Sequence, residues 1–166
     1  MKQFQIYIAI LLACLTVVPA NAKKKKDPYR IPANYEIQEI GVGKEGTKVF
    51  KIWCYGKKPE DAIKEAKRAA VAACIFRGLS NTPALCADPS TAQETYKDFF
   101  ADFFDEDGGA YIQFINLSTD GMPSGQDRLK TSKGYKIGIK VQVMHANLRE
   151  YLETKNIIKK LTDGFY

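Results

Sequence analysis

Apolar residues alternate or cluster in four short stretches of the chain, and each stretch predicts a β-strand. The stretch 134–144 is the clearest, because every second residue from Ile137 to Val143 is apolar while Lys136, Lys140 and Gln142 belong to the other face. This alternation is typical of an antiparallel strand with one face in the core and one in water. The other predicted strands are 35–42, 48–55 and 110–117.

Three further stretches have the spacing of helices. The first, 59–77, begins with Pro59 and two acidic residues, which suit a helix N-terminus, and Gly78 is a candidate cap. Its second half, from Ala69 to Phe76, contains no charged residue. We therefore expect this half to be surrounded, with a sheet or a helix lying close to its alanines. The other predicted helices are 91–105 and 148–162.

The helix predicted over 91–105 is rich in aromatic residues and begins with a capping box of Thr91 and Glu94. Aromatic side chains at a spacing of three and four residues usually belong to a core. If exposed, they would form an apolar patch for a partner, so both interpretations are kept. The candidate partner-surface residues are Tyr96, Phe99, Phe100, Phe103 and Phe104.

The order of elements is strand, strand, helix, helix, strand, strand, helix. It predicts an α+β fold in which a four-stranded, mainly antiparallel sheet is packed by the Ala-rich helix, the aromatic helix and a C-terminal helix. We expect one domain over 35–166, preceded by a basic flexible lead-in over 23–34. The polar connection 118–133 is long enough to be mobile or functional, and part of it near 128–131 extends the next strand.

Residues 1–22 have the pattern of a secretory signal peptide, because an apolar run is followed by Ala-Asn-Ala at 20–22. The run is shorter than the roughly 20 apolar residues of a membrane span. Export predicts a location in the periplasm or at the outer membrane or cell surface. Two alternatives remain. The segment 11–14 (Leu-Leu-Ala-Cys) resembles a lipobox in which Cys14 carries a lipid, and an uncleaved anchor would keep the domain inside the cell.

Charge is concentrated in the leader and the lead-in. The chain has 166 residues and a formal net charge of +6, and Lys2 with Lys23–Lys26 supplies five of these charges. The remainder is close to neutral, so the sequence predicts no specific nucleic-acid partner. Lys23–Lys26 form either a solvated leader or a contact with an anionic membrane surface or other polyanion. Apolar residues make up 45% of the chain, which suits a globular protein.

Three cysteines lie outside the leader: Cys54, Cys74 and Cys86. No pair has metal-ligand spacing and the chain has a single histidine, so no metal site is expected. In an oxidising envelope we expect a disulfide between Cys74 and Cys86, which would join the end of the first helix to the following loop. Cys54 is expected to pack as a small apolar residue. The alternative is that all three are reduced and buried.

The sequence carries no motif for nucleotide binding, serine hydrolysis or zinc proteolysis, and no cofactor or catalytic residue is predicted. His145 follows a strand without a recognisable nucleophile or orienting group. The acidic segment 98–107 contains pairs of carboxylates, which normally form a solvated face. An envelope hydrolase that uses these carboxylates is the alternative function.

The unit formed by 48–55, 59–77 and 110–144 has the order strand-helix-strand-strand. Its Ala-rich stretch 58–73, and Val-Gln-Val at 141–143 followed by Leu-Arg-Glu-Tyr-Leu at 148–152, resemble small envelope modules. Such modules occur in exported bacterial lipoproteins and in the N-terminal domain of flagellar-assembly proteins. The junction at 21–26 (Asn-Ala-Lys-Lys-Lys-Lys) is similar to those of exported Bacteroidetes proteins. The resemblance implies a non-catalytic interaction or assembly module with an envelope protein as partner.

Overall fold

The structure is a computed structural model that describes residue 29 and residues 34–118 and 121–160. The predicted signal peptide 1–22, with Cys14, and the Lys23–Lys26 run lie outside the described residues. The strands are β1 (Tyr35–Val42), β2 (Thr47–Gly56), β3 (Ile115–Leu117), β4 (Arg128–Thr131) and β5 (Gly134–Met144). The α-helices are α2 (Pro59–Ala72), α3 (Pro89–Thr95), α4 (Lys97–Phe103) and α5 (His145–Thr154).

The five strands form one antiparallel sheet around β5. Its order is β1-β2-β5-β3, and β4 also pairs with β5. Because β2 occupies one edge of β5, β3 and β4 share the other edge, β3 along Val141–Val143 and β4 along Gly134–Ile137. The α+β class is confirmed. The sheet has five strands rather than the four expected, because residues 128–131 of the long polar connection form a strand of their own.

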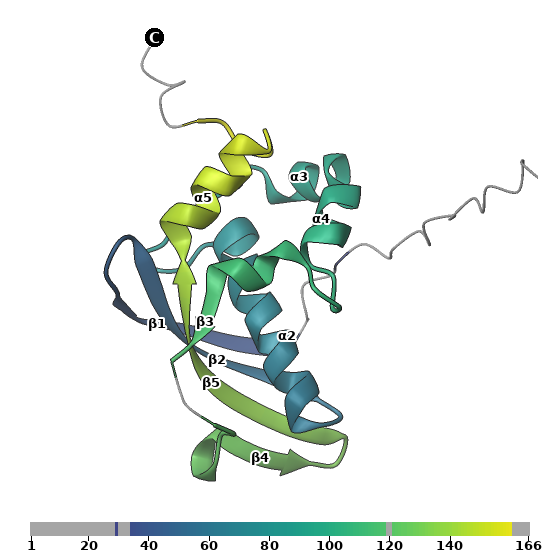
Figure 1. The fold of residues 1–166 in the computed structure, drawn as a ribbon. Helices are drawn as coiled ribbons and strands as arrows, with labels where there is room; N and C mark the ends of the chain where they lie inside the picture. The colour runs from purple at the N-terminus through teal and green to yellow at the C-terminus, as the bar shows by residue number, and fades with distance from the viewer. Residues whose placement is uncertain (1–28, 30–33, 119–120, 161–166) are drawn as a thin grey trace, which may run out of the picture.

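The core side of the sheet is covered by α2, which lies across β2 and β5 (Figure 1). On β2 the buried residues are Phe50, Ile52 and Cys54, and on β5 they run at every second position from Ile137 to Val143. The buried Cys54 packs as the small apolar residue expected from the sequence. The alternation of apolar residues in 134–144 therefore predicted correctly which residues of β5 belong to the core.

The surface of α2 that meets the sheet is made largely of alanine. Ala62, Ala66 and Ala70 are fully buried, and so is every residue from Ala69 to Ile75. Alanine has no side chain beyond Cβ, which lets the helix backbone approach β2 and β5 closely. The prediction that the uncharged half of this helix is surrounded is confirmed.

The end of α2 widens into a π-helical turn, Ala73–Arg77, which Gly78 terminates. Gly78 has a φ of 69°, and a Cβ there would lie 2.7 Å from the backbone nitrogen of Ala84. Both the left-handed backbone and the close approach of the returning chain require glycine. The loop after the helix is thereby folded back against its last turn.

The aromatic stretch forms two short helices rather than one. Asp88, not Thr91, is the N-cap of α3, and Pro89 occupies the first helical position. Tyr96, with φ −110° and ψ 29°, separates α3 from α4. The Thr91–Glu94 capping box was therefore the wrong start, because the cap signal lies three residues earlier.

Two other predicted elements have different bounds. Residues 110–114 form a 3₁₀ turn instead of the start of a strand, because Tyr111 and Phe114, three residues apart, both enter the core while Ile112 is exposed. The last helix begins at His145 and ends at Thr154. Asn156 then adopts a left-handed φ of 56°, which stops the helix eight residues before the predicted end.

Replacing Ala70 by leucine should destabilise the protein by about 1–3 kcal/mol, because the added carbons have no space between α2 and the sheet. Lys64→Leu introduces the same side chain at an exposed position of the same helix and should change stability by less than about 0.5 kcal/mol. Urea unfolding followed by circular dichroism measures both. Equal stability of the two variants would contradict the close packing described for α2.

Candidate functional site

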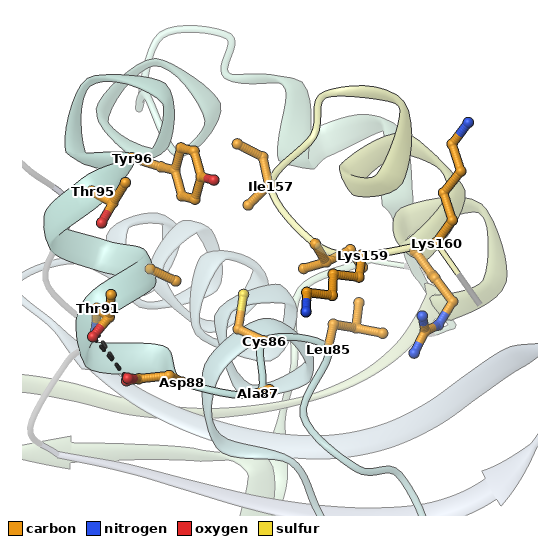
Figure 2. Close-up of a pocket in the computed structure, with 13 residues that line it drawn as sticks. Leu85, Cys86, Ala87, Asp88, Thr91, Thr95, Tyr96, Ile157, Lys159 and Lys160 are labelled. Atoms are coloured by element: carbon orange, nitrogen blue, oxygen red, sulfur yellow. Dashed lines mark hydrogen bonds between the residues drawn. The ribbon is translucent and has the colours of Figure 1, made fainter. Parts of the chain in front are cut away.

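A cleft of about 780 Å³ lies between α3, the loop before it and the segment that follows α5 (Figure 2). Its volume is within the range of about 300–1,000 Å³ that is usual for ligand sites. The lining residues come from three parts of the chain: Leu85, Cys86, Ala87 and Asp88 of the loop, Thr91, Ala92, Thr95 and Tyr96 of the α3 stretch, and Arg149, Ile157, Ile158, Lys159 and Lys160.

The floor of the cleft is apolar and firmly placed. Leu85, Ala92 and Ile157 are buried there, and Figure 2 shows the Tyr96 ring facing Ile157 across the cleft. The backbone N–H of Leu85 donates to the Cys74 carbonyl at 3.0 Å, and the next N–H donates to the following carbonyl at 2.9 Å. These bonds use carbonyls of the π-helical turn and hold the loop against the end of α2.

The wall formed by α3 carries hydroxyl groups and one carboxylate. Asp88 accepts hydrogen bonds from the backbone N–H and the hydroxyl of Thr91, at 3.1 and 2.7 Å. These bonds lower the pKa of Asp88, so its carboxylate is ionised and its oxygens serve the helix N-terminus. Thr95, one turn further along, is exposed on the same wall.

The opposite wall is cationic. Arg149 Nη1 pairs with Glu153 Oε1 on the same helix at 3.0 Å. After the helix, the N–H of Ile157 donates to the Leu152 carbonyl at 2.9 Å and turns the chain along the cleft. Lys159 and Lys160 follow, exposed and with no ion pair to any other described residue.

A polar network holds the loop after α2 to the sheet. The Glu39 side chain is only 6% exposed and accepts the Thr82 hydroxyl at 3.1 Å and the Asn81 N–H at 3.2 Å. Lys48 Nζ lies 3.6 Å from the same carboxylate and donates to the Asn81 carbonyl. The buried carboxylate therefore positions the turn from which the cleft loop starts.

His145 lies beside this network at the start of α5. Its Nε2 is buried and has no hydrogen-bond partner among the described residues. Burial, followed by the positive charges of Lys48 and Arg149, lowers the pKa of His145, while Glu39 acts in the opposite direction. The neutral ring is therefore the form that the fold accommodates.

The three described cysteines are all free thiols, so the expected disulfide between Cys74 and Cys86 is absent. The two backbone hydrogen bonds of the loop place Leu85 beside Cys74 and Cys86 beside Ile75, so the two cysteines are out of register. Burial raises the pKa of Cys86 to about 11 and those of Cys54 and Cys74 to about 12. None is a thiolate nucleophile at neutral pH.

The predicted aromatic surface is mostly core. Phe100, Phe103 and Phe104 are 3%, 2% and 1% exposed, so they are corrected from candidate surface residues to core residues. They pack with Phe76, Tyr111, Phe114 and Tyr151 in a continuous set of ring contacts. Phe99 is partly buried and stacks on Phe103. Only Tyr96 of the five predicted residues lines the cleft.

Tyr29 shows that the predicted lead-in touches the body of the protein. Its ring stacks on Phe104 with centroids 4.2 Å apart. The guanidinium of Arg68, a residue of α2, lies 4.6 Å from the centroid of the Tyr29 ring. Arg68 also pairs with Glu65 and with Glu106 of the acidic turn. Aromatic packing and cation–π attraction together hold this single residue in place.

The carboxylates of 98–107 do not line the cleft. Glu106 pairs with Arg68 at 2.7 Å, and Asp105 accepts the N–H of Asp107, so these side chains stabilise the turn. In the described part of the chain no group of three His, Cys, Asp or Glu side chains is arranged to hold a metal ion. The same residues contain no helix with the length and apolar character needed to cross a membrane.

The cleft combines an apolar floor with polar walls, and its described lining residues include no histidine and no thiolate. An apolar floor with a few polar groups on its walls is the usual composition of a ligand-binding site. Comparison of the chain with protein-family models, with curated proteins and with solved structures gives no match.

Sequence reasoning missed most of the cleft. Lys159 and Lys160 were assigned to the end of a helix, although Asn156, which adopts αL more readily than most residues, was a signal for an earlier stop. Asp88-Pro89 was a signal for the start of α3. The meeting of these two segments depends on tertiary packing and has no local signature.

Alkylation should find three thiols that react only after unfolding. In a chain without residues 1–22, iodoacetamide at pH 8 is expected to leave the folded protein unmodified, because burial keeps Cys54, Cys74 and Cys86 protonated and covered. In denaturant without reductant, intact mass should show three adducts. A single adduct under those conditions would mean that two cysteines are paired.

Stability should fall as the pH is lowered below about 6.5, the ordinary pKa of histidine. The unfolded chain then binds a proton at His145, whereas the folded chain, in which that pKa is lowered, does not. Free energies of unfolding measured between pH 5 and 8 should depend less on pH in His145→Gln than in the wild type. An unchanged slope in the variant would contradict the assignment to His145.

Proposed function

We propose that this protein is an exported, non-catalytic interaction module of the cell envelope, which holds a segment of a partner protein in the cleft between α3 and the segment after α5. The observation that carries the proposal is the cleft itself, in which an apolar floor lies between polar walls. The floor supplies hydrophobic contact and the walls supply hydrogen bonds and charge, which is the usual division of roles in a binding site.

The leader pattern at 1–22 supports the envelope location, and the resemblance to assembly and binding modules supports a non-catalytic role. The hydrolase alternative has no comparable support. Within 98–107, the Asp105 carboxylate accepts a backbone hydrogen bond in the turn and the Glu106 carboxylate pairs with Arg68 of α2. Binding through Lys23–Lys26 concerns residues outside the described part of the chain.

Site-specific photo-crosslinking tests this proposal in cells that make the protein. Benzoylphenylalanine in place of Thr95, which is exposed on the cleft wall, should form a covalent adduct with an envelope protein. The same group in place of Lys64, exposed on α2 outside the cleft, is the matched control and should form none.

A blocking variant separates cleft binding from chance contact. Ala87 is exposed and lines the cleft, so Ala87→Trp should fill it without disturbing the core. The Thr95 adduct should disappear when this substitution is present in the same chain. An adduct that persists in the blocked protein, or that forms equally from position 64, would refute the cleft as the binding site.

A further inference from the structure

The two long walls of the cleft differ in charge. On the wall after α5, Lys159 and Lys160 are exposed and have no ion pair with another described residue. Arg149 beside them is already paired with Glu153 at 3.0 Å. On the α3 wall the single carboxylate, Asp88, is engaged by the N–H and hydroxyl of Thr91 at the helix N-terminus. Among the described residues, the uncompensated charge at the cleft is therefore positive and lies on one side.

The floor between these walls is apolar and therefore favours apolar side chains on a ligand. Leu85, Ala92 and Ile157 are 6%, 9% and 9% exposed, and Tyr96 closes the side opposite Ile157 (Figure 2). A ligand that fits both features carries an apolar group toward the floor and an anionic group toward the lysines.

Building on the proposed function, we infer that the occupant of the cleft is an acidic peptide segment, with an apolar anchor residue on the floor and Asp or Glu side chains facing Lys159 and Lys160. The hydroxyls of Thr91 and Thr95 give the facing wall a polar character that suits a peptide backbone. A lipid acyl chain needs a continuous apolar channel, and here polar groups line both walls. Charge complementarity and the mixed lining together favour a peptide.

The test uses matched sets of short synthetic peptides with a central leucine. Each set has an acidic member with flanking glutamates, a neutral member with glutamines and a basic member with lysines. In fluorescence anisotropy at low salt, the full chain should bind the acidic members about tenfold more tightly than the neutral ones, since each of two exposed ion pairs adds a modest contribution to binding. The preference should weaken as salt is added.

Charge reversal identifies the lysines responsible. Lys159→Glu/Lys160→Glu should abolish the acidic preference and improve binding of the basic members. Lys130→Glu/Lys133→Glu, which makes the same change in net charge at exposed positions on the β4–β5 hairpin, should leave the preference unchanged. An acidic preference that survives reversal at 159 and 160, or that falls equally in both variants, would overturn the inference.

The outcomes separate this inference from the proposed function. Equal binding of all three members, blocked by Ala87→Trp, would overturn the acidic preference and leave the cleft as a peptide site. Absence of binding by every member together with absence of the Thr95 adduct would refute both. Binding of phosphatidylglycerol vesicles that needs Lys159 and Lys160, without any peptide preference, would replace the peptide by a membrane surface and overturn the inference.

Discussion

The contact between α2 and the sheet is made by alanine on one side and by β-branched and aromatic residues on the other, and it determines how close the two layers lie. Ala62, Ala66 and Ala70 add almost no thickness, while Phe50 and Ile139 fill the space above the strands. A larger residue on the helix would separate the layers, and a smaller one on the strands would leave a cavity. The position of the end of α2 follows from this separation.

The cleft depends on that position. Its floor is attached to the last turn of α2 by the hydrogen bonds of Leu85 and Cys86, and the preceding turn is attached to the sheet through Glu39. The cationic wall is connected to the sheet through α5, which begins at His145, directly after the last residue of β5. Both walls are therefore mounted on the sheet, although they are about 60 residues apart in sequence. Sites supported in this way by regular elements keep their geometry better than sites on free loops.

The sequence predicts the parts of this molecule whose pattern is local. The strands 35–42 and 134–144 and the alanine-rich helix are found at nearly the predicted bounds, because alternation and helical spacing directly reflect burial. The predicted strand at 110–117 failed because Tyr111 and Phe114 enter the core three residues apart, a spacing that a period of two does not describe. The cysteine pairing failed because a shift of one residue in the loop is set by the π-helical turn, which has no sequence signature.

The long separation between β2 and β5 has a consequence for how the chain acquires its fold. These two strands form the longest ladder of the sheet, yet about 80 residues lie between them. Closing so large a loop carries an entropic cost that only the complete ladder offsets, so the sheet core forms late and cooperatively. During synthesis, α2 and β2 are made long before β5, so the part of their apolar surface that β5 covers stays exposed until β5 has left the ribosome. A chain with this order cannot complete its central sheet before most of its length has been synthesised.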